Sequence, residues 1–394
     1  MTIESNGAQK DFQPAGVVTV SFAHGAHDLY TAFFSTLLPV LIERLSLTNT
    51  MAGLLSVFMR FPSVLQPLIG HLADRKNLKL LFILAPTITG AAMSLLGVAN
   101  ATGFVAFLLV VAGTSSAALH AIGPVVGSTY SGNRLGKGMS FWMVGGELGR
   151  TLGPIVAVSF ISYLTIEKLP WMMLAGVFAS VFLSTRFRTI STKAPDTQAE
   201  IHWKSALKNM KGILLPLSAI VMTHAMMTAT INTFLTTFMT DEGASLSLAG
   251  WSLSILQIAG VAGAMLAGPL SDKFGRLRML GISFIVTPIA MFLFILSKGM
   301  WQIPFLILAG FFGLSITPVL MAIIMETYPE QRSFANGVYM TTSFAASAVA
   351  VLLAGFLADL VDLRFAFMVS AAILPLGLFL IRFLPKSEVV RSSE

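Results

Sequence analysis

The chain has 394 residues, of which 55% are hydrophobic and 11% are charged, and its mean hydropathy is +0.81. Soluble domains typically carry about 25% charged residues, so the composition excludes a soluble globular protein. Cysteine is absent, which excludes disulfides, thiolate metal sites and cysteine nucleophiles. The net charge of +7 is distributed along the chain in a way that does not suit nucleic-acid binding.

Twelve stretches are long and apolar enough to cross a bilayer as helices, each of which needs about 20 residues. Long continuous apolar runs are unlike the short alternating segments of barrel strands. The expected fold is therefore an all-α membrane protein with twelve transmembrane helices in two six-helix bundles. The expected spans are 17–42, 51–73, 80–99, 103–129, 139–163, 170–185, 212–238, 248–270, 279–297, 302–326, 334–359 and 364–385.

A long polar segment divides the spans into two sets of six. We expect a cytoplasmic tail over 1–16, a first bundle over 17–185, a linker over 186–211, a second bundle over 212–385 and a tail over 386–394. With the N-terminus inside, 19 of the 25 Lys and Arg residues fall on the inner side. Basic loops favour the cytoplasmic side, so we expect both termini in the cytoplasm of a bacterial inner membrane. The N-terminal segment also lacks the pattern of a secretory signal.

One loop occurs twice. "GHLADRKNLKLL" at 70–81 follows the second span, and "GPLSDKFGRLRML" at 268–280 follows the eighth. Gly70 and Gly268 lie 198 positions apart, almost half the chain. Each copy places an aspartate four residues after the glycine and a basic residue next. Small residues allow neighbouring helices to approach closely, so we expect close helix contacts at both glycines.

The repeated loop resembles the signature of the major facilitator superfamily, and the resemblance covers the whole chain. Asn77 stands where the signature has a second glycine, whereas Gly275 keeps it. The chain also resembles the fosmidomycin-resistance branch of bacterial efflux proteins. That narrower resemblance rests on "HGAHDLY" in span one, "LHAIGPVVGSTYSGNRLGKGMS" at 119–140, "VGGELGRTLGP" at 144–154 and "METYPEQR" at 325–332.

The resemblance implies two bundles that rock about a central site and open it alternately to each side. The repeated loops would then form an inner gate, with Asp74 and Asp272 binding partners across the bundle interface when it is shut. Glu326 lies at the cytoplasmic end of span ten beside Arg332 and is assigned to the same gate. The expected gating residues are Gly70, Asp74, Arg75, Gly268, Asp272, Arg276, Glu326 and Arg332.

Span one carries a polar stripe. Ser21, His24, Asp28, Thr31 and Ser35 are spaced by three and four residues, so they share one helix face. Asp28 lies about 18 Å into the span at 1.5 Å per residue, near the middle of a roughly 30 Å hydrocarbon core. A charged side chain there is costly and faces the protein interior or water.

Three more charges lie at similar depth in the first half: Arg60, Glu147 and Arg150. Glu147 and Arg150 are three residues apart and can pair directly, and Asp28 and Arg60 lie on consecutive spans and can also pair. A purely structural alternative is two ion pairs that lock the first bundle. We favour proton coupling, with Asp28 as the proton carrier and Glu147 as the rival carrier. His24 shares the polar stripe with Asp28 and is assigned to the same role.

Substrate contacts are expected from both halves. Two arginines suit an anionic group, whereas a cationic compound would prefer the carboxylates and aromatic walls, and the sequence supplies both. Histidines in spans four and seven, and amides in spans seven and eight, lie at suitable depth. The expected substrate-binding residues are Arg60, Arg150, His120, His224, Asn232 and Gln257.

Span five has glycines at every fourth position: Gly145, Gly149 and Gly153. We expect them to form a smooth ridge for a neighbouring helix, with Glu147 and Arg150 projecting away towards the cavity. Pro154 follows and is expected to kink the helix. In the superfamily, such a fifth span resembles the antiporter signature, which favours export.

No resident metal or cofactor is expected, because no His-x-x-x-His spacing occurs, although His24, Asp28 and His224 could in principle gather into a site. His27 points about 100° away from the polar stripe and is expected to be structural. Phosphate loops and nucleophile elbows are absent from the sequence, so neither an enzyme nor ATP drive is expected.

The expected function is that of a monomeric, proton-coupled drug antiporter that exports small anionic or amphiphilic compounds. One alternative is a proton symporter that takes up an organic anion. Another is a flippase for lipids or lipid-linked sugars, or a regulatory membrane scaffold.

Overall fold

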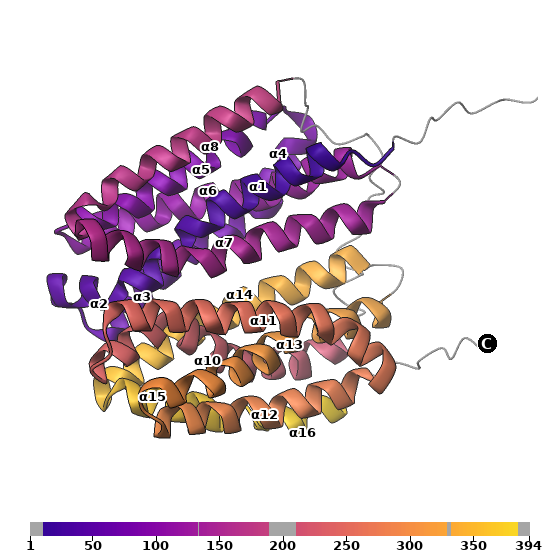
Figure 1. The fold of residues 1–394 in the computed structure, drawn as a ribbon. Helices are drawn as coiled ribbons and strands as arrows, with labels where there is room; N and C mark the ends of the chain where they lie inside the picture. The colour runs from indigo at the N-terminus through magenta and orange to yellow at the C-terminus, as the bar shows by residue number, and fades with distance from the viewer. Residues whose placement is uncertain (1–10, 133, 189–209, 329–331, 385–394) are drawn as a thin grey trace, which may run out of the picture.

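The expected all-α fold with two six-helix halves is confirmed. A computed structural model describes residues 11–132, 134–188, 210–328 and 332–384, and it contains helices and no strands in these ranges. The first half (indigo to magenta in Figure 1) contains α1 (Pro14–Thr31), α2 (Phe33–Leu45), α3 (Asn49–Arg60), α4 (Gln66–Arg75), α5 (Lys79–Ser94), α6 (Thr102–Ser131), α7 (Leu135–Leu164) and α8 (Met173–Arg186). The second half contains α10 (Lys211–Asp241), α11 (Leu246–Phe274), α12 (Arg276–Leu296), α13 (Gln302–Thr327), α14 (Arg332–Leu360), α15 (Leu363–Ile373) and α16 (Leu376–Leu380).

Three spans consist of two helices each: α1 with α2, α3 with α4, and α15 with α16. The first helix begins at Pro14, three residues before the expected span. Most of the expected linker, residues 1–10 of the first expected tail and all of the second expected tail lie outside the described residues.

Helix length and hydropathy together distinguish nine of the twelve spans from the other three. Nine helical stretches among the described residues are long and apolar enough to cross a membrane. The other three spans are α1 with α2, α3 with α4, and α7. These three carry Asp28, Arg60, Glu147 and Arg150, so the charges at middle depth lie on the spans whose helices are shorter or less apolar than those of the other nine.

The second span is broken next to its buried charge. α3 ends at Arg60, and residues Phe61–Leu65 form a 3-10 segment before α4 begins. Pro62 lacks an N–H and cannot continue the α-helical hydrogen-bond ladder, which explains the break. A Cβ on Gly113 of α6 would clash with the Met59 carbonyl. The glycine therefore lets α6 approach the chain directly beside Arg60.

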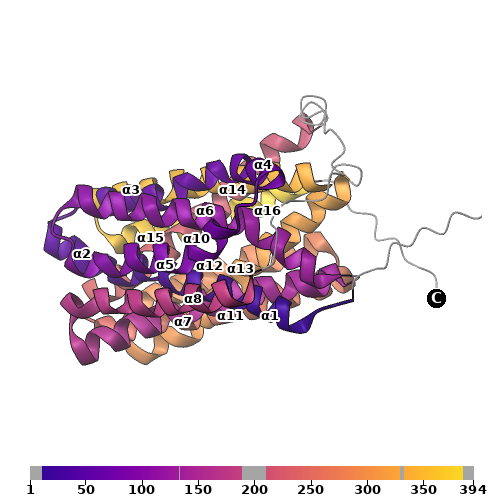
Figure 2. The same cartoon turned by 90° about the horizontal axis from the view of Figure 1, so that it is seen from above.

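The two halves are held together at the end of the molecule far from the described termini (Figures 1 and 2). At the start of α3, the backbone amides of Asn49 and Thr50 donate to the Asp359 carboxylate of α14 at 2.6 and 2.8 Å. Ser162 of α7 and Ser247 of α11 share a hydroxyl hydrogen bond of 3.0 Å. These contacts close the interface between the halves at the far end.

The end that carries the repeated loops differs from the expectation. A Cβ placed on Gly70 or Gly268 would have no described atom within 4 Å. The close helix approach predicted at both glycines is therefore wrong for this conformation, in which the two helices present these positions to open space.

The expected gate contact of Asp272 also differs. Its carboxylate pairs with Arg276 at 2.5 Å, and Arg276 pairs with Glu326 at 2.7 Å. All three residues belong to the second half, so in this conformation Asp272 makes its ion pair inside its own bundle and not across the interface. The side chains of Asp74, Arg75 and Arg332 lie outside the described part of the structure.

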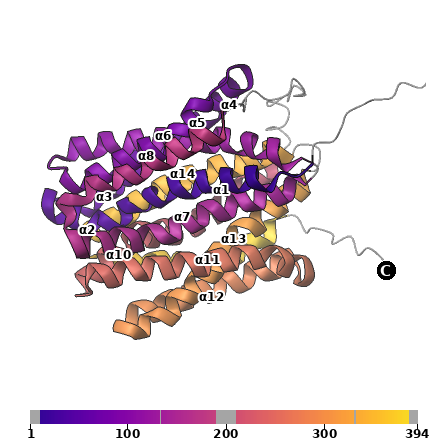
Figure 3. The same ribbon diagram turned by 45° about the horizontal axis from the view of Figure 1, so that its top comes forward.

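The glycine ridge of α7 packs directly on α1, as expected, and Figure 3 shows the two helices side by side. A Cβ on Gly145 would clash with the Ser21 carbonyl, and one on Gly149 would clash with the Gly25 carbonyl. The two backbones are therefore in direct contact, which larger residues would prevent. α7 is one continuous helix that includes Pro154.

We predict that Gly149→Ala lowers thermal stability, because the added methyl group has no space against α1. Overpacking of this kind typically costs about 1–3 kcal/mol. Gly268→Ala is the matched control, since its methyl group meets open space and alanine has the higher helix propensity. Melting of the purified protein in detergent checks this. Equal melting temperatures for the two variants would contradict the close crossing of α1 and α7.

We also predict that Asp359→Ala loosens the far end of the molecule. The variant loses two charge-assisted hydrogen bonds between the halves, and about 1.4 kcal/mol would shift the closed-to-open ratio about tenfold. The chain has no cysteine, so spin labels on Glu43→Cys and Val361→Cys report the distance at this end directly. Asp362→Ala is the control, because Asp362 caps only its own helix at Phe365. Identical distance distributions for both variants would argue against this role of Asp359.

Candidate functional site

A cavity of about 490 Å³ lies between the two halves, a volume within the usual range of about 300–1,000 Å³ for small-molecule sites. Both halves contribute polar side chains to its wall. Seven of the nine residues predicted for proton coupling and substrate binding line it: Asp28, Arg60, His120, Glu147, Arg150, Asn232 and Gln257. The four charges at middle depth thus share one cavity with two amides of the second half.

Asp28 is the most enclosed charge of the site, with 2% of its surface exposed. Its Oδ2 accepts from Arg150 at 3.0 Å and lies 3.3 Å from Nε2 of His24, and its Oδ1 accepts from Nδ1 of His27 at 2.8 Å. The predicted pair with Arg60 is wrong. The glycine ridge allows α7 to pack directly on α1, so Arg150 of α7 lies within hydrogen-bond distance of Asp28.

The predicted pair of Glu147 and Arg150 is confirmed. Arg150 bridges the two carboxylates, so Asp28, Arg150 and Glu147 form one chain of ion pairs within the first half. Arg60 has no described carboxylate within ion-pair distance, although it lines the same cavity. The purely structural alternative of two locking ion pairs does not fit this arrangement, because Arg60 has no carboxylate partner among the described residues.

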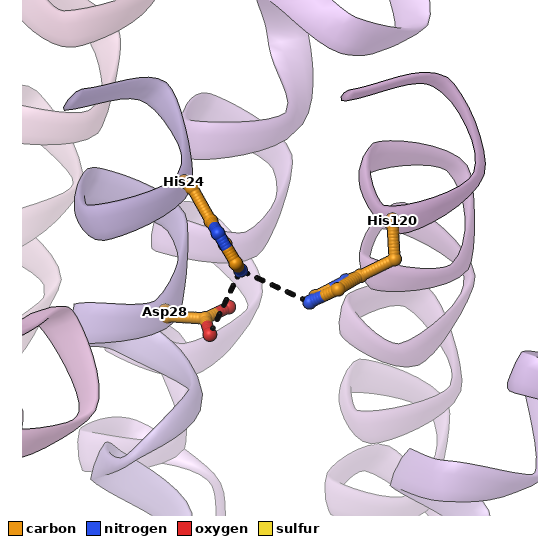
Figure 4. Close-up of side chains that lie close together, drawn as sticks. All are labelled: His24, Asp28 and His120. Carbon is orange, nitrogen blue, oxygen red and sulfur yellow. Dashed lines mark hydrogen bonds and ion pairs between the residues drawn. The ribbon is translucent and has the colours of Figure 1, made fainter. Parts of the chain in front are cut away.

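His24 is held by α7 and faces His120 of α6 (Figure 4). Its ring stacks on Trp142 with centroids 3.9 Å apart, and its Nδ1 lies 2.8 Å from the Trp142 carbonyl. Its Nε2 lies 3.1 Å from Nε2 of His120, whose Nδ1 lies 2.8 Å from the Ser116 carbonyl. A Cβ on Gly146 would overlap the His24 ring, so the "VGGELGR" stretch supplies the space for this histidine.

His27 belongs to the site, although the helical spacing assigned it a structural role. Its ring is fully buried, and its Nδ1 donates to Asp28 while its Nε2 has no partner among the described residues. The wheel angle did not predict this contact, because neighbouring side chains on a helix can still meet when one of them is a short carboxylate. The available signal was simple adjacency, since His27 directly precedes Asp28 in the sequence.

The combination of His24, Asp28 and His224 considered as a metal site is not assembled. Nε2 of His224 donates to the Gly313 carbonyl of α13 at 2.9 Å, inside the second half, and His224 does not line the cavity. The predicted substrate contact by His224 is therefore not supported by its position. His120 takes its place beside the other two, and one ligand atom from each of His24, Asp28 and His120 lies within 4.8 Å of the others.

The second half contributes neutral hydrogen-bonding groups. Gln257 of α11 donates to the side-chain oxygen of Asn232 of α10 at 3.1 Å, and Asn232 donates to the Thr228 carbonyl at 2.8 Å. Both amides line the cavity opposite the charged wall. The cavity therefore has one ionic side and one neutral polar side.

Comparisons with known proteins agree with this architecture. The family model of the Major Facilitator Superfamily matches residues 20–221 and 217–394. The fosmidomycin resistance protein of Escherichia coli K12 is 24% identical over 373 residues, which cover 93% of this chain and 91% of that protein. The multidrug resistance protein MdtG of Salmonella arizonae is 23% identical over 282 residues, or 68% of this chain and 70% of that protein.

Among solved structures, the fold resembles a bacterial homologue of the human lysosomal transporter Spinster, in an inward-facing and occupied conformation. The TM-score is 0.77 at 13% identity, over 93% of this chain and 96% of that one. The match of the family model over nearly the whole chain identifies the protein: it belongs to the Major Facilitator Superfamily of transporters and lies near the fosmidomycin-resistance branch.

Proposed function

We propose that this protein is a proton-coupled antiporter that exports small compounds carrying an anionic group. The observation that carries this proposal is Arg60, which lines the cavity and has no carboxylate partner among the described residues, whereas Arg150 binds both Asp28 and Glu147. A guanidinium group without a carboxylate partner offers a fixed donor fork to a carboxylate, phosphate or phosphonate. The neutral amides opposite it would bind the remainder of the substrate.

The chain of ion pairs formed by Asp28, Arg150 and Glu147 is the proposed site of proton coupling. A buried carboxylate in a membrane protein marks proton or substrate pathways, and Asp28 is linked through Arg150 to Glu147 at the cavity wall. A substrate that competes for Arg150 would change the charge balance of both carboxylates. Glu147 remains the alternative carrier, because it reaches the cavity directly.

Export by alternating access is supported by the names of the relatives, two of which are resistance proteins. The far-end contacts would open and the end with the repeated loops would close during the cycle. The ion pairs of Arg276 with Asp272 and Glu326 would then rearrange towards the first half. We further propose a monomer in a bacterial inner membrane, with both termini in the cytoplasm on the evidence of the basic loops.

Symport of an organic anion is the second candidate, and the same position of Arg60 at the cavity wall favours it. A bound anion beside Arg60 would attract a proton into the same cavity, because opposite charges stabilise one another at short range. Anion and proton would then bind together and move in the same direction.

The first prediction from this proposal concerns Arg60. Expression of the wild-type chain in a susceptible bacterium should raise the inhibitory concentration of fosmidomycin, a small phosphonate, and Arg60→Gln should abolish most of the protection. Loss of a charged hydrogen bond of about 1.5–3 kcal/mol lowers binding about 10- to 100-fold. Arg44→Gln is the matched control, since Arg44 binds the Gly97 carbonyl and Glu167 outside the cavity.

Three results would count against the proposal. Full protection by Arg60→Gln at equal expression would remove Arg60 from substrate binding. Sensitisation of the cells by the wild-type chain would favour uptake and hence the symport candidate. If the wild-type chain changed the inhibitory concentration of neither phosphonates nor small carboxylates, a flippase or a membrane scaffold would become the favoured function.

A further inference from the structure

Two histidine rings meet behind the cavity wall with their tautomers fixed by the backbone. Nδ1 of His24 lies 2.8 Å from the Trp142 carbonyl. Nδ1 of His120 lies 2.8 Å from the Ser116 carbonyl, which is closer than the Ser116 hydroxyl at 3.3 Å. A carbonyl oxygen can only accept a hydrogen bond. Each Nδ1 must therefore carry a hydrogen, which in a neutral imidazole leaves Nε2 with a bare lone pair.

The two bare nitrogens would then face each other. Nε2 of His24 lies 3.1 Å from Nε2 of His120 and 3.3 Å from Oδ2 of Asp28. With both rings neutral, three lone pairs would converge with no hydrogen between the two rings. Buried acceptors without a donor are costly, so this arrangement calls for one bound cation at the point where they meet.

We infer that one proton is bound between Nε2 of His24 and Nε2 of His120, which makes this histidine pair the proton-binding site of the cavity. The proton is delivered by a hydronium ion from solvent, which leaves a water molecule, and it forms an N–H bond at Nε2 of His24. That N–H then donates to Nε2 of His120 and to the carboxylate of Asp28. The pair holds three N–H groups in total, two at Nδ1 and one shared at Nε2.

His24 is the ring best placed to carry the positive charge. It is stacked on Trp142 at an interplanar angle of 19°, and an aromatic face attracts a cation. The neighbouring groups are poorer sites for the proton. His27 would gain a second N–H with no described acceptor, and Asp28 already accepts hydrogen bonds from Arg150 and His27. Asp28 therefore serves as the counter-charge.

A proton fits this position better than a divalent metal ion. The distances of 3.1 and 3.3 Å between ligand atoms would also suit a tetrahedral ion such as zinc. However, the same Oδ2 of Asp28 already binds the Arg150 guanidinium at 3.0 Å. A divalent ion would add two positive charges beside Arg150, whereas a proton adds one.

The charged and titratable groups around the pair come from three of the elements packed near it. α1 supplies His27 and Asp28, α7 supplies Glu147 and Arg150, and α3 supplies Arg60 across the cavity. With the proton bound, His24 balances Asp28 and Arg150 balances Glu147, so Arg60 is left for an anion. His120 and Asp28 line the cavity, whereas His24 lies behind them, so His120 is the route for proton exchange.

The site itself is tested without any substrate. The chain has six histidines, and nitrogen NMR of protein with labelled histidine distinguishes an imidazolium from either neutral tautomer. We expect near neutral pH one imidazolium and one neutral ring with its hydrogen on Nδ1, assigned with His24→Phe and His120→Phe. The inference would be overturned if His24 and His120 were both neutral, or if the neutral ring of this pair carried its hydrogen on Nε2.

Two further measurements sharpen the result. His120→Phe removes the acceptor, so proton binding at His24 should weaken about tenfold. His224→Gln, a histidine of the second half bonded to one backbone carbonyl, should leave the His24 signal unchanged. Stoichiometric zinc in the protein purified without chelator, together with metal-shifted signals from both rings, would replace the proton with a metal ion and overturn the inference.

The role of this proton in transport rests on the proposed function, and the two can fail separately. Three N–H groups on the pair without any proton movement during transport would refute proton coupling and leave the proton site intact. Proton-coupled transport with only two N–H groups on the pair would refute the site and move the coupled proton to Glu147 or Asp28.

Discussion

The direct contact between the backbones of α1 and α7 is the constraint on which the site depends. Three glycines of α7 remove the side chains that would separate the helices, and Gly146 leaves room for the His24 ring. As a result, Arg150 reaches Asp28, and the Trp142 carbonyl reaches His24. Removing one partner of a buried pair is far more destabilising than replacing the whole pair. The glycines and the charges are therefore one structural unit.

Much of this arrangement was predictable from the sequence. The spans, the repeated loop and the four charges at middle depth follow from hydropathy, spacing and rise per residue. The partners of those charges did not follow, because periodicity gives the face of a helix and not the helix that it meets. Consecutive spans predict a pair of Asp28 with Arg60, whereas the glycine ridge brings α7 closer to α1 and gives Asp28 the partner Arg150. His27 was set aside by its wheel angle, although it directly precedes Asp28.

The two halves have different chemistry despite their common fold. The first half holds the ions and the histidine pair, and the second presents neutral amides to the same cavity. Movement of one half against the other would therefore bring different polar groups to a bound molecule without separating the ion pairs of the first half. The contacts of Asp359 at the far end, together with the lack of any described atom within 4 Å of a Cβ on Gly70 or Gly268, describe one such position of the halves.

The most direct test of the account is proton movement driven by substrate in proteoliposomes. The central claim is that buried charges couple the movement of protons to the movement of substrate. A phosphonate gradient imposed on the wild-type protein should drive protons in the opposite direction, and Asp28→Asn should abolish that movement while the protein stays folded. Protons that move with the phosphonate would contradict antiport and support symport. Phosphonate transport without any proton movement would contradict the coupling itself.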